Sequence, residues 1–353
     1  MIGVFDHPCL AGLFADDDAC RIWSAERQLQ HMLSFEAAYS RALGTAGVVE
    51  TDVAASAALL IEKFKPDLQQ LRDGTARDGL PVPALVAQLK KAGGSLAPAI
   101  HAGATSQDVL DTALALTLRE TTDLLVARLK TLATDLDSLN DAFGANPLMG
   151  RTRMQAAMPI RVSDRLTTWR APLDAHCDRL MELRPHTEKL QLGGAAGDRK
   201  ELEPFGDRVA RALAAELDLA VSDFTWHAAR DGIAAYASVL SLITGTLGKM
   251  GQDICLMAQQ GLDEIRINGG GGSSAMPHKA NPILAELLVT LARFNATQLS
   301  GIHQAQVHEQ ERSGSAWALE WMILPQMAVA AARSLGAGSS LCRNVTSMGG
   351  ASN

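Results

Sequence analysis

The most informative segment of the chain is residues 106–140, which read SQDVLDTALALTLRETTDLLVARLKTLATDLDSLN. Apolar side chains recur there at intervals of three and four residues, the spacing that places them on one face of an α-helix. The segment contains neither glycine nor proline, the two residues that most often end a helix. We therefore predict one continuous helix that is longer than most helices of globular proteins.

Further segments carry the same periodicity toward the C-terminus. The predicted helices cover residues 159–186, 230–262, 282–308 and 315–335. The first hundred residues read as shorter helices. Aromatic residues make up only 4% of the chain, which disfavours β-strands. Long helices with few strand candidates predict an all-α fold, built as an extended long-helix bundle.

The order of short and long helices predicts three parts in the chain. An N-terminal helical domain is expected over residues 1–104, and a central long-helix domain over residues 105–345. Residues 346–353 read as a frayed tail.

Composition excludes several classes of protein. The 353 residues are 47% hydrophobic with a net charge of −7, which argues against a disordered chain and against a nucleic-acid-binding protein with a basic face. The five cysteines are scattered and unpaired in sequence, so a disulfide framework is not expected. Apolar runs fall short of the roughly 18 residues that a membrane span needs, and the N-terminus lacks the basic start of a signal peptide. We expect a soluble cytoplasmic protein.

A loop of unusual composition separates two predicted helices at residues 268–282, NGGGGSSAMPHKANP. It is not a phosphate-binding Walker loop, because Lys279 is followed by alanine rather than by Ser or Thr. Four consecutive glycines suit a surface loop and a mobile catalytic lid equally well. The hydroxyls of Ser273 and Ser274, together with Lys279 and Asn281, favour the second interpretation, since they can surround an anion.

Residues 101–113, HAGATSQDVLDTA, place Thr105, Ser106 and Gln107 at the start of the longest helix. A hydroxyl N-cap with Asp108 in the first turn would stabilise this helix end. The same free N–H groups and hydroxyls can instead bind a carboxylate or phosphate of a ligand. The local residues favour capping and leave anion binding open.

A second polar segment, residues 150–159, reads GRTRMQAAMP and comes just before a predicted helix. Arg151, Thr152, Arg153 and Gln155 offer the cations and amides that a substrate with several carboxylates would need. A salt-bridged loop explains the same residues equally well.

Residues 308–317, HEQERSGSAW, look superficially like a zinc-binding His-Glu-x-x-His helix. Arg312 stands where the second histidine belongs, so no metal site is predicted there. No other metal or cofactor motif is found, and none is expected.

Three of these segments together resemble the signature regions of the fumarase/aspartase superfamily: residues 103–113, 150–159 and 271–282. The third, with its Gly-Ser-Ser-x-Met-Pro-x-Lys-x-Asn-Pro pattern, is the most specific. Supporting segments are residues 32–42, 191–197, 226–231 and 308–321, and the resemblance covers nearly the whole chain. Within the superfamily it is strongest toward the cycloisomerases that close a lactone on a carboxymuconate.

The resemblance implies a mostly helical homotetramer in which each active site takes one signature region from each of three subunits. It implies a small tricarboxylate substrate and chemistry without metal or cofactor, because the substrate's own carboxylate accepts the electrons as an aci-carboxylate. It assigns catalytic roles to Ser273 and His101. Substrate contacts are expected at Thr105, Ser106, Gln107, Arg151, Thr152, Arg153, Gln155, Ser274, Met276, Lys279, Asn281 and Arg312.

Two departures from the superfamily pattern affect these expectations. Arg153 and Ala156 occupy positions where many relatives carry a catalytic histidine, so His101 or another histidine is expected to replace it. The chain also ends near the point where relatives continue into a small C-terminal domain, which we expect to be absent. Two alternatives stay open, namely another lyase of the superfamily such as adenylosuccinate lyase, and a non-catalytic helical scaffold.

Overall fold

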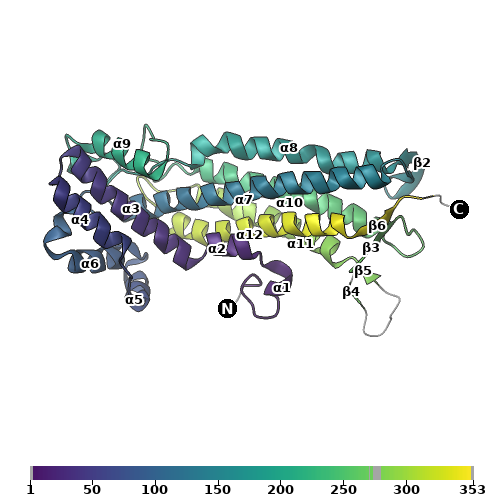
Figure 1. Cartoon of the computed structure of the whole chain (residues 1–353), viewed down its shortest axis with the longest axis horizontal. Coiled ribbons are helices and arrows are strands. Elements are labelled where there is room, and N and C mark those ends of the chain that lie inside the picture. The colour runs from purple at the N-terminus through teal and green to yellow at the C-terminus, as the bar shows by residue number, and fades with distance from the viewer. Residues whose placement is uncertain (1–2, 270, 273–279, 351–353) are drawn as a thin grey trace.

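The computed structural model describes residues 3–269, 271–272 and 280–350. Five long helices run side by side along the longest axis of the molecule (Figure 1). They are α7 (Ser106–Phe143), α8 (Val162–Thr187), α10 (Asp231–Met257), α11 (Ile283–Ala305) and α12 (Ser315–Arg343). The all-α prediction is confirmed in its main point, since helices dominate the described residues.

Shorter helices cover one end of the bundle, at the left of Figure 1. They are α3 (Ala25–Ala46), α4 (Thr51–Glu62), α5 (Leu68–Asp78), α6 (Val82–Gly93) and α9 (Gly206–Leu217), with the 3-10 helices η1 (Gly94–Ala99) and η2 (Lys200–Leu202). Two small helices, α1 (Ala11–Phe14) and α2 (Asp17–Ile22), lie beside the middle of the bundle (Figure 1).

In the described residues, three two-stranded antiparallel sheets lie at the opposite end of the bundle (Figure 1). They are formed by β1 (Pro147–Thr152) with β2 (Gln155–Arg161), β3 (Ile265–Ile267) with β6 (Val345–Met348), and β4 (Gly271–Gly272) with β5 (Ala280–Asn281). Residues 150–159, for which a salt-bridged loop was one interpretation, form most of the first sheet, and the helix predicted from residue 159 begins at Val162. The second corrects the frayed tail, because β6 pairs with β3 through residue 348.

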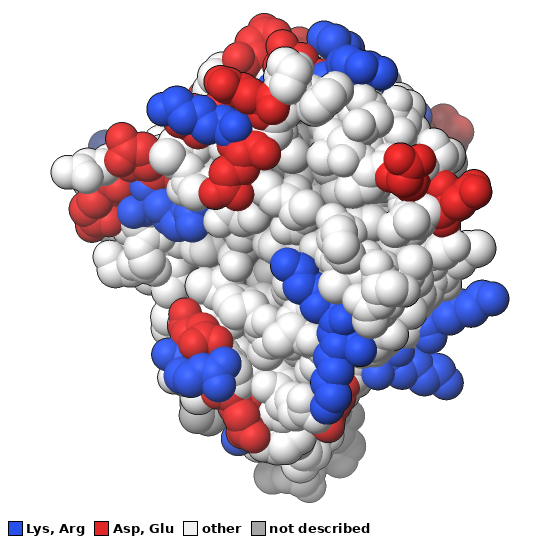
Figure 2. All heavy atoms as spheres, turned by 90° about the vertical axis from the view of Figure 1, so that its left-hand side faces the viewer, with Lys and Arg blue, Asp and Glu red and all other residues white. Residues whose placement is uncertain are grey.

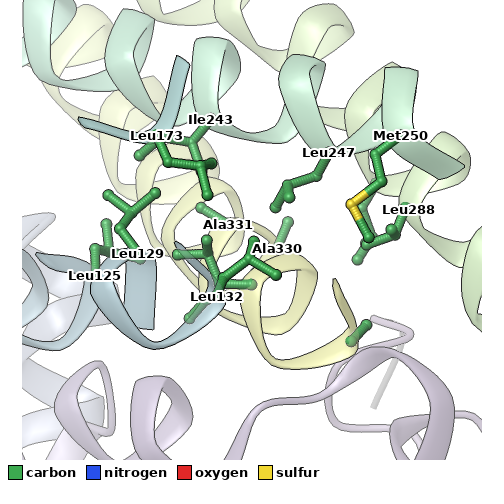
Figure 3. Packing of buried hydrophobic residues seen from close by; sticks show 14 of the residues in the cluster. Leu125, Leu129, Leu132, Leu173, Ile243, Leu247, Met250, Leu288, Ala330 and Ala331 are labelled. Carbon is green, nitrogen blue, oxygen red and sulfur yellow. The ribbon is translucent and has the colours of Figure 1, made fainter. Parts of the chain in front are cut away.

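Two apolar cores hold the molecule together. The larger joins the five long helices, and in Figure 3 leucines of α7 face Leu173 of α8, Ile243 and Leu247 of α10, and alanines of α12. The smaller lies among α3, α4, α6, α9 and the first turns of α7. Helix α7 therefore belongs to both cores, which fixes its first turns against the short helices. The predicted domain limits stay a prediction.

Two observations bear on membrane proteins and nucleic-acid-binding proteins, the two classes that the composition argues against. By length and composition α10 could cross a membrane, yet 61% of its most apolar window is buried inside the protein, as in the core helix of a bundle. The end of the molecule shown in Figure 2 carries Lys and Arg in separate groups, several of them beside Asp or Glu. On the described part of this face there is no continuous basic surface of the kind that nucleic-acid binding needs.

Candidate active site

The first signature segment forms the N-terminus of α7. Thr105 is the N-cap of this helix, and it forms a capping box with Asp108: the backbone N–H of Thr105 donates to Oδ2 of Asp108 at 2.9 Å, and the Thr105 side chain accepts from the backbone of Asp108. Capping, which the local residues favoured, is therefore present. Thr105 and Ser106 are half-buried rather than enclosed, so anion binding at their hydroxyls stays a prediction.

Asp108 has a larger role than a first-turn acid. Its buried carboxylate also accepts hydrogen bonds from the backbone N–H groups of Gly193 at 2.8 Å and Gly194 at 3.0 Å, and it lies 2.9 Å from Nε2 of His227. One side chain thus holds the start of α7, the loop at 191–197 and the segment before α10. Sequence reasoning missed this because the partners lie more than 80 residues away.

We expect Asp108→Asn to lower the free energy of unfolding by about 2–3 kcal/mol, because a neutral amide gives up the charged hydrogen bonds and turns an NH₂ group toward N–H donors. Denaturant unfolding measures the loss. Asp164→Asn is the matched control, since exposed Asp164 accepts from the backbone N–H of the α8 N-cap residue, Arg161, at 2.8 Å, as Asp108 does from Thr105. A loss no greater than that of the control would show that the glycine and histidine contacts contribute nothing.

His101 lies four residues before the N-cap and is bonded to a buried acid. Its Nδ1 is 2.6 Å from Oε1 of Glu36 on α3, and Glu36 is completely buried. Burial by itself lowers the pKa of His101, but the neighbouring Glu36 carboxylate outweighs burial and raises the pKa above its usual value. The imidazole is therefore held toward its charged form.

The remaining predicted residues at this end are Gln107 and Arg312. Arg312 is exposed, and its Nη2 donates to the carbonyl of Ala195 at 3.3 Å, which places it against the same 191–197 loop. Gln107 is buried, and its Nε2 donates to Asp111 at 3.0 Å and to the carbonyl of His227 at 2.9 Å. The substrate contact expected at Gln107 stays a prediction. Of its two amide atoms, Oε1 is the one that has no hydrogen-bond partner among the described residues.

Next to this end lies a buried ion cluster that sequence reasoning did not single out. Arg230 donates to Asp111 at 2.9 Å and to Glu320 at 3.0 Å, and it lies over the ring of Trp226 at 5.1 Å. The three charged side chains are at most 3% exposed. The cluster ties α7, α10 and α12 together beside a cavity of about 220 Å³. Its three charged residues lie in segments of the resemblance, Asp111 in residues 103–113, Arg230 in 226–231 and Glu320 in 308–321, but no motif paired them.

The second signature segment forms the hairpin β1–β2 at the other end of the bundle. Arg151 pairs with Glu264, so its charge is compensated inside the chain. The two turn residues, Arg153 and Met154, both have positive φ, at 49° and 66°. β2 is almost entirely exposed, and the Met154 side chain at the tip is 76% exposed. The hairpin therefore forms no enclosed site within one described chain around Thr152, Arg153 and Gln155.

The third signature segment is described only at its edges. Asn281 is half-buried in β5 and pairs with Gly271 of β4. The predicted catalytic Ser273 lies outside the described residues, as do the predicted contacts Ser274, Met276 and Lys279.

One chain does not bring the three segments together. Helix α7 has 38 residues and hence a length of roughly 55 Å. Thr105 and Ser106 lie at its start, whereas the hairpin follows its end and β4–β5 lies at the same end as the hairpin (Figure 1). No side chain spans such a distance, so the described chain contains separate parts of a site.

Comparison with known proteins gives a consistent result. The family model described as Lyase matches residues 14–296. The 3-carboxy-cis,cis-muconate cycloisomerase of Acinetobacter baylyi is 35% identical over 330 residues, covering 90% of this chain and 72% of that protein. The enzyme of the same name from Pseudomonas aeruginosa is 38% identical, covering 87% and 68%.

Solved structures agree with this grouping. The crystal structure of the 3-carboxy-cis,cis-muconate lactonizing enzyme from Pseudomonas putida has a TM-score of 0.89 and 34% identity, and the match covers 97% of this chain and 77% of that one. Both the sequence match and the shared architecture extend over most of the described helices. The chain therefore belongs to the lyase family within the fumarase/aspartase superfamily.

Proposed function

We propose that the chain is a cytoplasmic, homotetrameric cycloisomerase that converts 3-carboxy-cis,cis-muconate to a carboxymuconolactone, in the protocatechuate branch of aromatic catabolism. The observation that carries the proposal is the division of the predicted site between the two ends of α7. Relatives at 35–38% identity that carry the cycloisomerase name support the substrate.

Assembly of several copies follows from this division. A site that needs Thr105 and Ser106 from one end and Thr152 and Gln155 from the other is complete only when different copies supply them. The exposed hairpin supports assembly, because a strand with large apolar side chains such as Met158, 65% exposed, is suited to be covered by a second copy.

The reaction proposed for this site is an internal addition. One carboxylate of the substrate attacks the conjugated double bond and forms the C–O bond of the lactone. The displaced electron pair moves onto the carbon next to another carboxylate, which holds it as an aci-carboxylate, and a proton is then delivered to that carbon. We assign proton transfer to Ser273, and binding of the electron-accepting carboxylate to Lys279 and Asn281.

Charge near the site suits a substrate with three carboxylates. Arg153 is exposed at the hairpin tip, and Arg312 is exposed at the other end of the bundle. Together with Lys279 they would surround the substrate with cations once the copies assemble, although the chain as a whole is acidic.

The test is the loss of ultraviolet absorbance of 3-carboxy-cis,cis-muconate with purified protein. We expect turnover without added metal, and loss of most of it in Ser273→Ala, because no other hydroxyl is assigned to move the proton. Ser138→Ala, on the exposed face of α7, is the control. Full activity of the Ser273 variant, or inactivation of the unmodified protein by a chelator, would exclude this mechanism. Release of fumarate from adenylosuccinate would instead identify a different lyase.

A further inference from the structure

One face of helix α3 contacts residues 99–102, the segment that leads into the first signature region. Glu36, Tyr39 and Ser40 lie one turn apart on this helix, so their side chains point the same way. The Tyr39 hydroxyl donates to the carbonyl of Ala102 at 2.6 Å, and the Ser40 hydroxyl donates to the carbonyl of Ala99 at 2.8 Å. Together with the bond from Glu36 to His101, these contacts fix residues 99–102 against α3.

The contact between Glu36 and His101 differs from the other two because it involves charge. Glu36 is completely buried, and its Oε2 has no hydrogen-bond partner among the described residues. A buried carboxylate without a full set of donors is costly unless a cation lies beside it. The imidazole of His101 is the group in contact with it, at 2.6 Å.

The geometry of His101 leaves its other nitrogen available. Nδ1 faces Glu36, whereas Nε2 has no hydrogen-bond partner in the described chain and is not among the fully buried atoms. The backbone at His101 has φ 55°, a conformation that a non-glycine residue adopts only when its surroundings hold it. The ring is thus fixed at one nitrogen and open at the other, four residues from the helix N-terminus predicted to bind an anion.

We propose that Glu36 is a positioning residue, which holds His101 as an imidazolium whose Nε2–H binds a carboxylate of the substrate. This rests on the function proposed above, and it makes His101 a binding cation rather than the proton donor. The carboxylate would lie between Nε2 of His101 and the hydroxyls of Thr105 and Ser106 at the start of α7. A charged donor at this point distinguishes an anionic substrate from a neutral one.

Other charged groups around the ring set its titration. Asp108 on α7 favours the imidazolium, and Lys90 on α6 opposes it. Burial raises the pKa of the neighbouring Tyr39, and the negative charge of Glu201 adds to that rise. Because the pKa of His101 is raised in the folded protein, its charge and the stability that the charge confers are present below about pH 6.5 and are lost as the pH rises through the raised value. Substrate affinity is expected to fall over the same interval.

The experiment compares Glu36→Gln with the unmodified protein from about pH 5.5 to 9. Glutamine keeps the size and an acceptor oxygen but removes the charge. KM is expected to rise with pH, and we expect the midpoint of this rise to lie about one pH unit lower in Glu36→Gln. At a pH above both midpoints, KM of the variant should then be about tenfold higher than KM of the unmodified protein, while kcat changes little. His101→Asn should abolish this dependence, and the double variant should equal His101→Asn.

Ser40→Ala is the matched control, because it removes an uncharged contact from the same helix face to the same segment. It is expected to leave the midpoint unchanged. A midpoint that Glu36→Gln does not move would overturn the proposal, as would a fall in kcat with constant KM, which would make His101 the acid.

Two measurements keep this result separate from the identity of the substrate. Histidine side-chain NMR gives the titration of His101 directly, and propane-1,2,3-tricarboxylate serves as an unreactive probe of binding. If the protein does not turn over the muconate, a lower His101 midpoint and weaker probe binding in Glu36→Gln still support the pair. An unchanged His101 titration contradicts it whatever the reaction.

Discussion

Replacing Arg230 by methionine is expected to lower the free energy of unfolding by about 3–5 kcal/mol. The guanidinium is 1% exposed and neutralises two buried carboxylates, those of Asp111 and Glu320. Methionine fills a similar volume, so the main effect is two buried acids without a cation. Oδ1 of Asp111 already lacks a hydrogen-bond partner among the described residues, and the Gln107 amide that donates to Oδ2 carries no charge to replace that of Arg230.

The loss in free energy of unfolding caused by Arg230→Met should grow as the pH rises from acidic to neutral. Burial raises the pKa of Asp111 above its usual value, although Arg230 counteracts the shift. An acid whose pKa is raised by folding destabilises the folded state as the pH rises through that value, and removing Arg230 raises the pKa further. The loss in Arg230→Met is therefore largest near neutral pH and shrinks as the pH falls toward about 4.

Denaturant unfolding at two pH values measures both effects. Arg170→Met is the matched control, because Arg170 also bonds two carboxylates, Asp137 at 3.0 Å and Asp174 at 2.8 Å, but these are largely exposed. That variant is expected to lose less than about 1 kcal/mol. Equal losses in the two variants would mean that burial of the Arg230 cluster has no energetic consequence.

Mixing two inactive variants is expected to restore activity. One variant lacks both hydroxyls at the start of α7 (T105A/S106A), and the other lacks the proposed proton-transfer residue (S273A). If each site combines the two ends of α7 from different copies, random hybrid tetramers contain some sites with neither substitution. Roughly a quarter of the sites should be intact when equal amounts of the two variants are unfolded and refolded together.

The control mixes T105A/S106A with His101→Asn, two variants altered at the same end. Hybrids of these two should regain nothing beyond the activity of the separate proteins. Each homotetramer should be shown by circular dichroism to be folded, since loss of the Thr105 cap by itself costs about 1 kcal/mol. Absence of recovery in the first mixture, with hybrids present by mass, would place the whole site within one chain.

The helices were predictable from the sequence because burial on one face leaves a regular apolar pattern. Residues 106–140 carry that pattern and form α7, which extends to Phe143. The hairpin β1–β2 leaves no such pattern. β2 is exposed along nearly its whole length, so its sequence needs no alternation of apolar and polar residues. Its turn also lacks the usual signal, because Arg153 and Met154 adopt positive φ where Asn-Gly is expected.

The site was predictable only where its residues are close together in sequence. The motifs pointed to His101, Thr105 and Ser106, but not to Glu36, which contacts His101 from 65 residues away. The partners of Asp108 and Arg230 lie still farther along the chain. A buried acid becomes meaningful only when the fold shows which cation faces it, and no local pattern specifies that pairing.

The 38-residue length of α7 has a consequence for how this protein can change in evolution. Inserting or deleting one residue in the middle of the helix would shift one end by 1.5 Å and rotate it by about 100° relative to the other. Reacting groups must be placed to within about 0.5 Å. Substitutions on the helix surface are therefore tolerable, whereas a change of length in α7 would displace the half-sites at its two ends in every copy at once.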